Sequence, residues 1–216
     1  TLIDRRRPGE ETSYGNAGLI QREGVYPYGF PHDFGALFRY ALNNTIDAHY
    51  HPSALPGLVP FLLKYWWHSG LVRHKAIARL YAPLIERSIE EHAELIAEAG
   101  AERLIEKKGW IKAFRSTRER DRAFAEAESL SAEFGVRHQQ LSAEDLAREE
   151  PFLVSGLTGG LRWSDPWSIR DPYSLVRAYV TLFEQRGGTV MSGDAATIER
   201  VLSGSGWRVA TPEGPL

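Results

Sequence analysis

An acidic residue near the start of the chain is the first candidate for chemistry. Leu2 and Ile3 predict a short strand, and Asp4 stands where that strand ends. A carboxylate in this place can accept hydrogen bonds from both ribose hydroxyls of a dinucleotide. The glycine-rich strand–turn–helix unit that precedes such an acid by about 20 residues is not in this sequence. Asp4 taken alone therefore fits a solvated acid at a strand end better than a ribose-binding acid.

A run of small and polar residues follows, over Ser13-Tyr14-Gly15-Asn16-Ala17-Gly18. Small side chains let the backbone approach a ligand closely, while Ser and Asn supply hydroxyl and amide groups for hydrogen bonds. The alternative is an ordinary tight turn, which an Asn-Ala-Gly stretch readily forms. This segment is the most specific indication of a binding site that the residues give.

Seven histidines raise the question of a metal site. His49 and His51 flank Tyr50, so both rings would lie on one side of an extended chain. No HExxH motif and no clustered carboxylates accompany them, and the sequence therefore argues against a bound metal. A GxSxG motif is also missing, which leaves a hydrolase with a nucleophile elbow unsupported.

The composition excludes several classes of protein. Of the 216 residues, 43% are hydrophobic and none is a cysteine, which is typical of a globular protein without disulfides or thiolate chemistry. The formal net charge of −2 gives no basic footprint for nucleic acid. The most apolar stretch, Ala54 to Trp67, contains Pro56, Pro60 and Lys64, so no transmembrane segment is predicted.

The hydrophobic pattern predicts alternating helices and strands. Residues 36–46 fit either a helix or a strand, and Pro83 is expected to kink the longest helix or to start a second one. The order of the elements indicates an α/β or α+β protein with interleaved parts. Helices are expected over 58–70, 75–99, 117–134 (capped by Thr117) and 171–187, with a short one after the capping box at Ser142; strands are expected over 1–4, 103–114 (two), 136–141, 159–163, 189–191, 195–202 and 207–211, the last two joined by Ser203 to Gly206.

Aromatic and basic residues adjoin in one predicted helix. Trp66 and Trp67 stand among Lys64, His68, Arg73, His74 and Lys75. This combination fits a patch that contacts a membrane surface. An aromatic core helix with a charged end explains it more simply.

Both ends of the sequence are unusual. The chain has no initiator Met, and residues 211–216 are expected to form the turn of a hairpin whose return strand is missing. A strand without a partner leaves its backbone groups unpaired. We therefore expect this chain to be an internal piece of a longer protein.

Several of these residues together resemble a known family. The motifs Ile3-Asp4-Arg5, Ser13 to Gly18, Leu157 to Leu161, Asp171-Pro172-Tyr173 and Gly187-Gly188 occur in the order typical of the FAD-dependent D-amino-acid dehydrogenase group. That group lies within the glycine oxidase and D-amino-acid oxidase superfamily. The resemblance extends along essentially the whole chain, and the Ser-Tyr-x-Asn-Ala-Gly stretch is its most specific part.

The resemblance implies an architecture and a set of site residues. It implies an incomplete FAD-binding Rossmann-like domain, over 1–46 and 166–216, with an α+β substrate domain inserted at 47–165. It assigns the substrate wall to His49, Tyr50, His51 and Trp163, and it places the arginine that binds the substrate carboxylate beyond Leu216. FAD would be bound by Asp4, Arg5, Ser13, Tyr14, Asn16, Ala17, Gly18 and the backbone near Ala196.

The implied reaction is oxidation of a D-amino acid to an imino acid, which hydrolyses to a 2-oxo acid and ammonia. Sarcosine, proline, hydroxyproline or an opine are alternative substrates, and a non-catalytic α/β binding module is an alternative from another class. The resemblance further implies a cytoplasmic protein. It is compatible with peripheral contact at the inner face of the cell membrane and with a quinone or the respiratory chain as electron acceptor.

Overall fold

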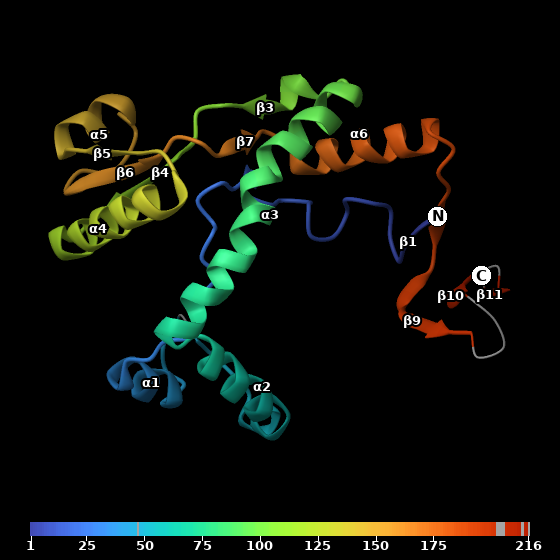
Figure 1. Ribbon diagram of the computed structural model, residues 1–216, viewed down its shortest axis with the longest axis horizontal. Helices are drawn as coiled ribbons and strands as arrows, with labels where there is room; N and C mark the ends of the chain where they lie inside the picture. Colours follow the sequence, from blue (N-terminus) through green and yellow to red (C-terminus); the bar gives the residue numbers. More distant parts are fainter. Residues whose placement is uncertain (47, 202–205, 213, 216) are drawn as a thin grey trace.

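The computed structural model describes residues 1–46, 48–201, 206–212 and 214–215 (Figure 1). Helices and strands alternate along the chain, as the fold class predicted from the sequence requires. The helices are α1 (Phe34–Ala41), α2 (Leu55–His68), α3 (Leu71–Glu98), α4 (Thr117–Phe134), α5 (Ala143–Glu149) and α6 (Pro172–Gln185), with the short 3-10 turns η1 (Pro52–Ala54) and η2 (Glu102–Leu104). The strands are β1 (Leu2–Asp4), β2 (Leu19–Ile20), β3 (Ile105–Glu106), β4 (Trp110–Phe114), β5 (His138–Leu141), β6 (Gly159–Trp163), β7 (Trp167–Ile169), β8 (Val190–Ser192), β9 (Asp194–Arg200), β10 (Trp207–Thr211) and β11 (Gly214–Pro215).

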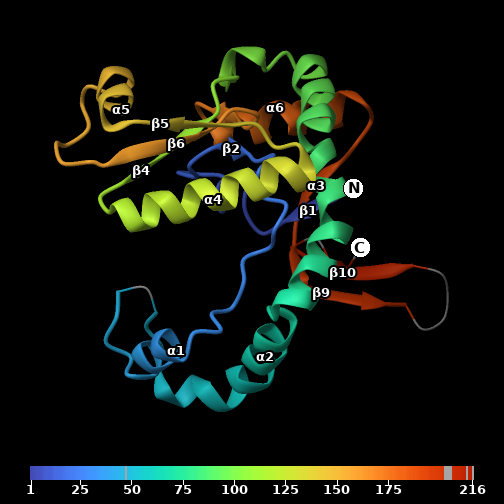
Figure 2. The same ribbon diagram turned by 60° about the vertical axis from the view of Figure 1, so that its left-hand side comes forward.

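One layer consists of an antiparallel sheet between two helices. The strand order is β4-β6-β5, and α4 and α5 lie on opposite sides of this sheet in Figure 2. Leu161 of β6 packs with Ala127 and Leu130 of α4 in a buried cluster. On the other side, a Cβ at Gly160 would lie 3.3 Å from Leu146 of α5. Glycine at this position therefore lets α5 approach the sheet closely.

The long helix α3 connects this layer to the rest of the molecule. Ala82 near its middle belongs to the same buried cluster as the sheet, and Ile96 near its end packs with Leu175 of α6. The helix continues through Pro83, so the alternative of a second helix starting there is wrong. Through α3, the two clusters fix α6 relative to the sheet.

The structure contains three further groups of strands. β1 pairs in parallel with β8, and Leu2 is opposite Val190. β2 and β3 both pair with β7 in a second small sheet. The strands β9, β10 and β11 form an antiparallel sheet, and every residue of β9 is exposed.

Most predicted elements are found close to their expected bounds, with three corrections. The segment 36–46, left open between helix and strand, is helical over residues 36–41, which belong to α1; Asp33 Oδ2 caps the first turn of this helix at 2.7 Å from the nitrogen of Ala36. Ser116, not Thr117, is the N-cap of α4. The return strand expected to be missing begins at β11, which pairs with β10. The predicted loop at 203–205 and the predicted strand end at Leu202 lie outside the described residues.

A hydrogen bond between two half-buried side chains connects α3 to α6, and the burial of its histidine predicts that stability depends on pH. His92 Nδ1 lies 2.9 Å from the hydroxyl of Tyr179; burial lowers the pKa of His92 and raises the pKa of Tyr179 to about 12. Below the ordinary histidine pKa of about 6.5, the unfolded chain takes up a proton more readily than the folded chain, so stability falls. We expect Tm to decrease between pH 7 and pH 5, and H92Q to reduce this decrease. Equal slopes in thermal melts of the two proteins would contradict this role.

Candidate functional site

Asp4 lies at the carboxyl end of a parallel strand pair. Its backbone oxygen accepts a hydrogen bond from Gly193, which follows β8, at 2.9 Å, and its Oδ1 accepts one from the nitrogen of Arg6 at 3.2 Å. A hollow of about 280 Å³ opens beside these strand ends, and Arg5 and Asp194 are among the residues that line it. Ligands of open α/β sheets bind outside the carboxyl ends of parallel strands. The position of Asp4 therefore fits a ribose-binding acid.

The segment Ser13 to Gly18 forms a compact turn against the start of α6. The backbone nitrogen of Asn16 donates to the backbone oxygen of Ser13 at 3.4 Å, and the side-chain oxygen of Asn16 accepts from the nitrogen of Gly18 at 2.9 Å. Gly18 is buried, and its oxygen accepts from Ile169 at 2.7 Å. Gly15 has a φ of +71°, and a Cβ added to it would have no neighbour within 4 Å. The turn thus presents exposed backbone at Gly15, while Gly18 fixes it to β7.

Tyr173 is a residue of this site that the sequence-based predictions did not include. Its ring meets that of Tyr14 edge to face at 6.0 Å, and its Cδ2 would lie 3.0 Å from a Cβ at Gly9. Asp171 caps α6 by accepting hydrogen bonds from Ser174 Oγ and from the Ser174 nitrogen, which lower the pKa of Asp171. The first turn of α6 therefore supports the whole loop from Gly9 to Gly18. A tyrosine directly after an N-cap Asp-Pro was the signal that could have found it.

We predict that Asp171→Ala lowers Tm by about 3 °C, because it removes the cap that orients this first turn. The lowered pKa of Asp171 means that its contribution is present above the ordinary carboxyl pKa and is lost as pH falls through the folded value. Thermal melts at pH 7 and pH 3 test this, because the difference between wild type and variant must shrink at the lower pH. A difference that does not change with pH would contradict the prediction.

The two groups of predicted cofactor residues lie at opposite ends of α6. Gly18 approaches Pro172 at the start of this helix, whereas β1 pairs with β8, which follows the end of the helix. A helix of this length is about 21 Å long. Such a separation suits an elongated dinucleotide with a ribose at one end and a ring system at the other. Ala196 lies exposed on β9, and its nitrogen donates to Asp194 Oδ1 at 3.0 Å.

The predicted substrate residues are not brought together. His49, Tyr50 and His51 lie in the connection between α1 and η1, where Asn43 makes two hydrogen bonds of 2.8 Å to the backbone of Tyr50. Trp163 is only 7% exposed, and it packs in the core of the β4-β6-β5 layer. Across 1–46, 48–201, 206–212 and 214–215, no three His, Asp or Glu side chains gather as potential metal ligands.

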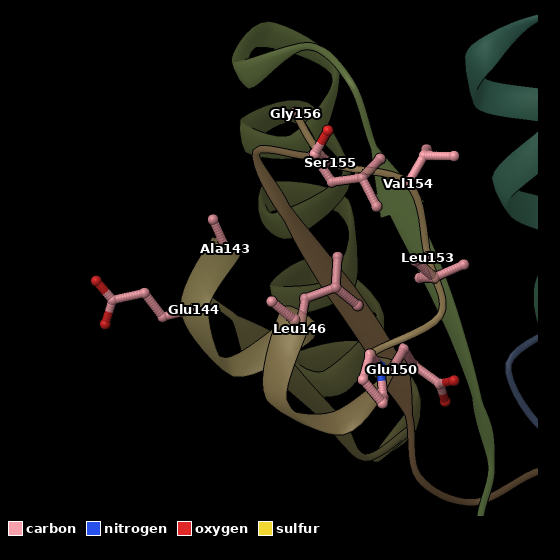
Figure 3. A pocket seen from close by; sticks show the side chains of 11 residues that line it. Ala143, Glu144, Leu146, Glu150, Leu153, Val154, Ser155 and Gly156 are labelled. Atoms are coloured by element: carbon pink, nitrogen blue, oxygen red, sulfur yellow. The ribbon is translucent and has the colours of Figure 1, made fainter.

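A separate hollow of about 430 Å³ lies between α5 and the loop that follows it. Figure 3 shows the side chain of Leu146 in this hollow, with Glu144 pointing away from it. None of the predicted site residues lines it, and α5 lies far from β1 in Figure 1. The hollow is therefore separate from the candidate cofactor site.

Curated relatives of this chain are enzymes of amino-acid oxidation by name. It is 29% identical to a D-amino-acid oxidase of Bradyrhizobium diazoefficiens, over 95% of this chain and 48% of the relative. It is 28% identical to a D-amino acid dehydrogenase of Chromohalobacter salexigens, over 100% of this chain and 52% of the relative. The chain thus spans about half the length of the curated relatives it matches.

Solved structures share the fold at lower sequence identity. Glycine oxidase from Geobacillus kaustophilus superposes with a TM-score of 0.57 and 17% identity, over 99% of this chain and 45% of that one. Iminodiacetate oxidase from Chelativorans sp. BNC1 gives a TM-score of 0.54 and 12% identity, over 99% and 45% of the two chains. A family model described as FAD dependent oxidoreductase, DAO, matches residues 1–215. The chain therefore belongs to the DAO family of FAD-dependent oxidoreductases.

Proposed function

We propose that the protein oxidises the CH–NH group of a D-amino acid to an imino acid, which hydrolyses to a 2-oxo acid and ammonia. The observation that carries this proposal is the place of Asp4 at the carboxyl end of β1, beside a hollow and parallel to β8. The names of the two curated relatives support a D-amino acid as the substrate. FAD, when bound, accepts the hydride from the substrate carbon.

The residues of this chain fit the two ends of the cofactor. Asp4 offers carboxylate oxygens to ribose hydroxyls, and Arg5 lines the adjoining hollow. Ser13, Tyr14, Asn16 and Ala17 supply polar groups and exposed backbone in the turn at the start of α6. Gly18 acts through packing, because both of its backbone polar groups are already hydrogen-bonded. The backbone at Ala196 offers its oxygen, since its nitrogen is occupied by Asp194.

The domain division at 46/47 and 165/166 is part of this proposal. In it, 47–165 forms the substrate domain and the flanking segments form part of the FAD domain. His49 and His51 are exposed and available as a substrate wall. Trp163 supports that domain from its core and would act on the substrate only indirectly.

The substrate is tested with the protein expressed from its complete gene and loaded with FAD. Under anaerobic conditions, we expect D-amino acids to bleach the flavin absorbance and to yield a 2-oxo acid and ammonia in equal amounts. Sarcosine, proline, hydroxyproline and an opine are the comparison substrates. If one of these compounds bleaches the flavin and no D-amino acid does, that compound becomes the proposed substrate. If neither the D-amino acids nor the comparison substrates bleach the flavin, the proposal is refuted. Oxygen and a soluble quinone, compared as oxidants of the reduced protein, identify the electron acceptor.

We expect this 216-residue chain alone not to retain FAD. Among the residues that the structure describes, no strand is followed by a glycine-rich turn and a helix, and the N-terminus of such a helix is what binds a pyrophosphate. Absorbance after exhaustive dialysis measures this. Stoichiometric FAD retained by this chain would contradict the expectation.

A further inference from the structure

The longest helix, α3, carries apolar side chains on two sides. One side lies in the protein core, where Ala82 and Ile96 belong to the two buried clusters. Leu80 and Leu84 are 82% and 70% exposed, and Leu80 points about 160° away from both core residues, at about 100° per residue. In the part of the chain that the structure describes, no helix is long and apolar enough to cross a membrane. A helix with one buried side normally carries polar residues on the other, so the exposed leucines mark a candidate interface.

The two leucines belong to a stripe of α3 that has opposite charges at its ends. Arg73 precedes Leu80 by seven residues, and Glu91 follows Leu84 by seven residues. Seven residues make almost two turns of helix, so these four side chains share one side of α3. All four residues are exposed. The order along the stripe is therefore positive, apolar, apolar, negative.

Arg73 is the available cation at the positive end of the stripe. Its guanidinium lies over the Trp67 ring, 3.8 Å from the ring centre, and a guanidinium in this position keeps donors at its edge for a carboxylate. The neighbouring cations face another helix, because Arg79 is ion-paired with Glu133 of α4 at 3.1 Å. The hydrogen bond from Arg79 lowers the pKa of Glu133 most, and the charge of Lys75 lowers it further. Arg79 and Lys75 therefore serve the contact between α3 and α4.

The other end of the stripe is acidic. Glu91 forms an ion pair with Arg87 on the same helix. The exposed residues Glu90 and Glu94 lie beside this pair. The acids outnumber Arg87 here, so this end of the stripe keeps an excess of negative charge.

We propose that a second copy of this protein packs on the stripe, with the two α3 helices antiparallel. A two-fold axis midway between Leu80 and Leu84 places each of these leucines against the other leucine of the partner. The same axis places Arg73 of each copy against the acidic end of the other, at Glu91. A two-fold interface uses one self-complementary patch on both copies, and this stripe has that property. A parallel pair of helices would instead place like charges together. This inference is independent of which substrate the protein oxidises.

The test is sedimentation velocity of the FAD-loaded protein, expressed from its complete gene, over a range of concentrations. We expect the wild type to form dimers. The variant L80S/L84S should raise the dimer Kd about tenfold or more, because it removes apolar area from both copies. R73E alone and E91R alone should each raise it about tenfold, since each brings like charges together at two symmetric points.

Mixing the two charge variants tests the antiparallel arrangement directly. An equal mixture of R73E and E91R should form heterodimers about as tight as the wild-type dimer, because each chain then offers the charge that the other requires. Both substitutions are at exposed positions, so circular dichroism and FAD content should match those of the wild type.

Matched controls keep the test specific to the stripe. R118E on α4 and E184R on α6 make the same charge changes at exposed positions of other helices, and both should sediment like the wild type, alone and mixed. A monomeric wild type, or a mixture of R73E and E91R that sediments like the separate variants, would overturn the proposal. An L80S/L84S protein that loses its helical signal or its FAD would also do so, because another part of the same protein would then cover the stripe.

Discussion

Replacing Gly18 by alanine is expected to destabilise the protein by about 3 kcal/mol and to lower Tm by about 10 °C. Gly18 has a φ of +68°, and an added Cβ would lie 2.3 Å from the oxygen of Ile169 and 3.0 Å from Pro172 Cγ. The two segments cannot simply separate, because the amide of Ile169 donates to the oxygen of Gly18 at 2.7 Å. The substitution must therefore disturb β7 and the start of α6 together. Urea unfolding of the two proteins measures the loss.

Gly15→Ala is the matched control for this prediction. Gly15 has nearly the same φ, +71°, and nothing within 4 Å of an added Cβ. It should therefore show only the cost of a left-handed alanine, about 1 kcal/mol. Equal destabilisation by the two substitutions would mean that backbone conformation, and not contact with Ile169, determines the role of Gly18.

The helices could be predicted from the sequence because their signals are local. Asp171 followed by Pro172 marks the start of α6, and Ser142 with Asp145 marks that of α5, where the predicted capping box is present. Each signal depends on hydrogen bonds within one turn of helix. The bounds of α4, α5 and α6 therefore needed no information about distant residues, whereas α2 and α3 begin three and four residues before their expected starts.

Strand pairing depends on residues far apart in the sequence, so it could be predicted only in part. β2 has two residues and β7 has three, and they pair with each other; neither was predicted, because neither carries a periodic pattern long enough to recognise. Trp163 shows a related limit: it was assigned to a substrate wall, but its side chain is buried, opposite Trp110 and His138 in the β4-β6-β5 sheet. Alternation along β6 indicates that one face is buried, without indicating what covers it.

The candidate site could be predicted from the sequence to a similar degree. The sequence showed an acid, Asp4, at the end of a predicted strand, and a run of small residues around Gly15. Their placement at the two ends of α6 depends on Gly18 packing against Pro172 and on β1 pairing with β8. Both contacts join segments more than a hundred residues apart in number, so no local signal encodes them.

Asp4→Ala is expected to weaken FAD binding by about 100-fold in the protein expressed from its complete gene. A charged acceptor gains about 1.5–3 kcal/mol from each hydrogen bond, and two ribose hydroxyls would donate to this carboxylate. A loss of about 3 kcal/mol corresponds to roughly a hundredfold change in Kd. Asp4→Asn keeps one acceptor oxygen without the charge, so its FAD affinity should lie between those of the wild type and Asp4→Ala. Quenching of FAD fluorescence during titration of the apoprotein measures all three affinities.

Glu10→Ala is the control, because Glu10 is an exposed acid in the same loop. Glu10→Ala should bind FAD like the wild type, whereas a general effect of negative charge near the site would change the FAD affinity of both Glu10→Ala and Asp4→Ala. Thermal melts separate binding from folding, since Asp4 also accepts a hydrogen bond from the nitrogen of Arg6 at 3.2 Å. Unchanged FAD affinity in a folded Asp4→Ala protein would make Asp4 a solvated acid at a strand end. The parallel pair β1–β8 would then need another residue to hold the cofactor, and Arg5, which lines the same hollow, would be the next to replace.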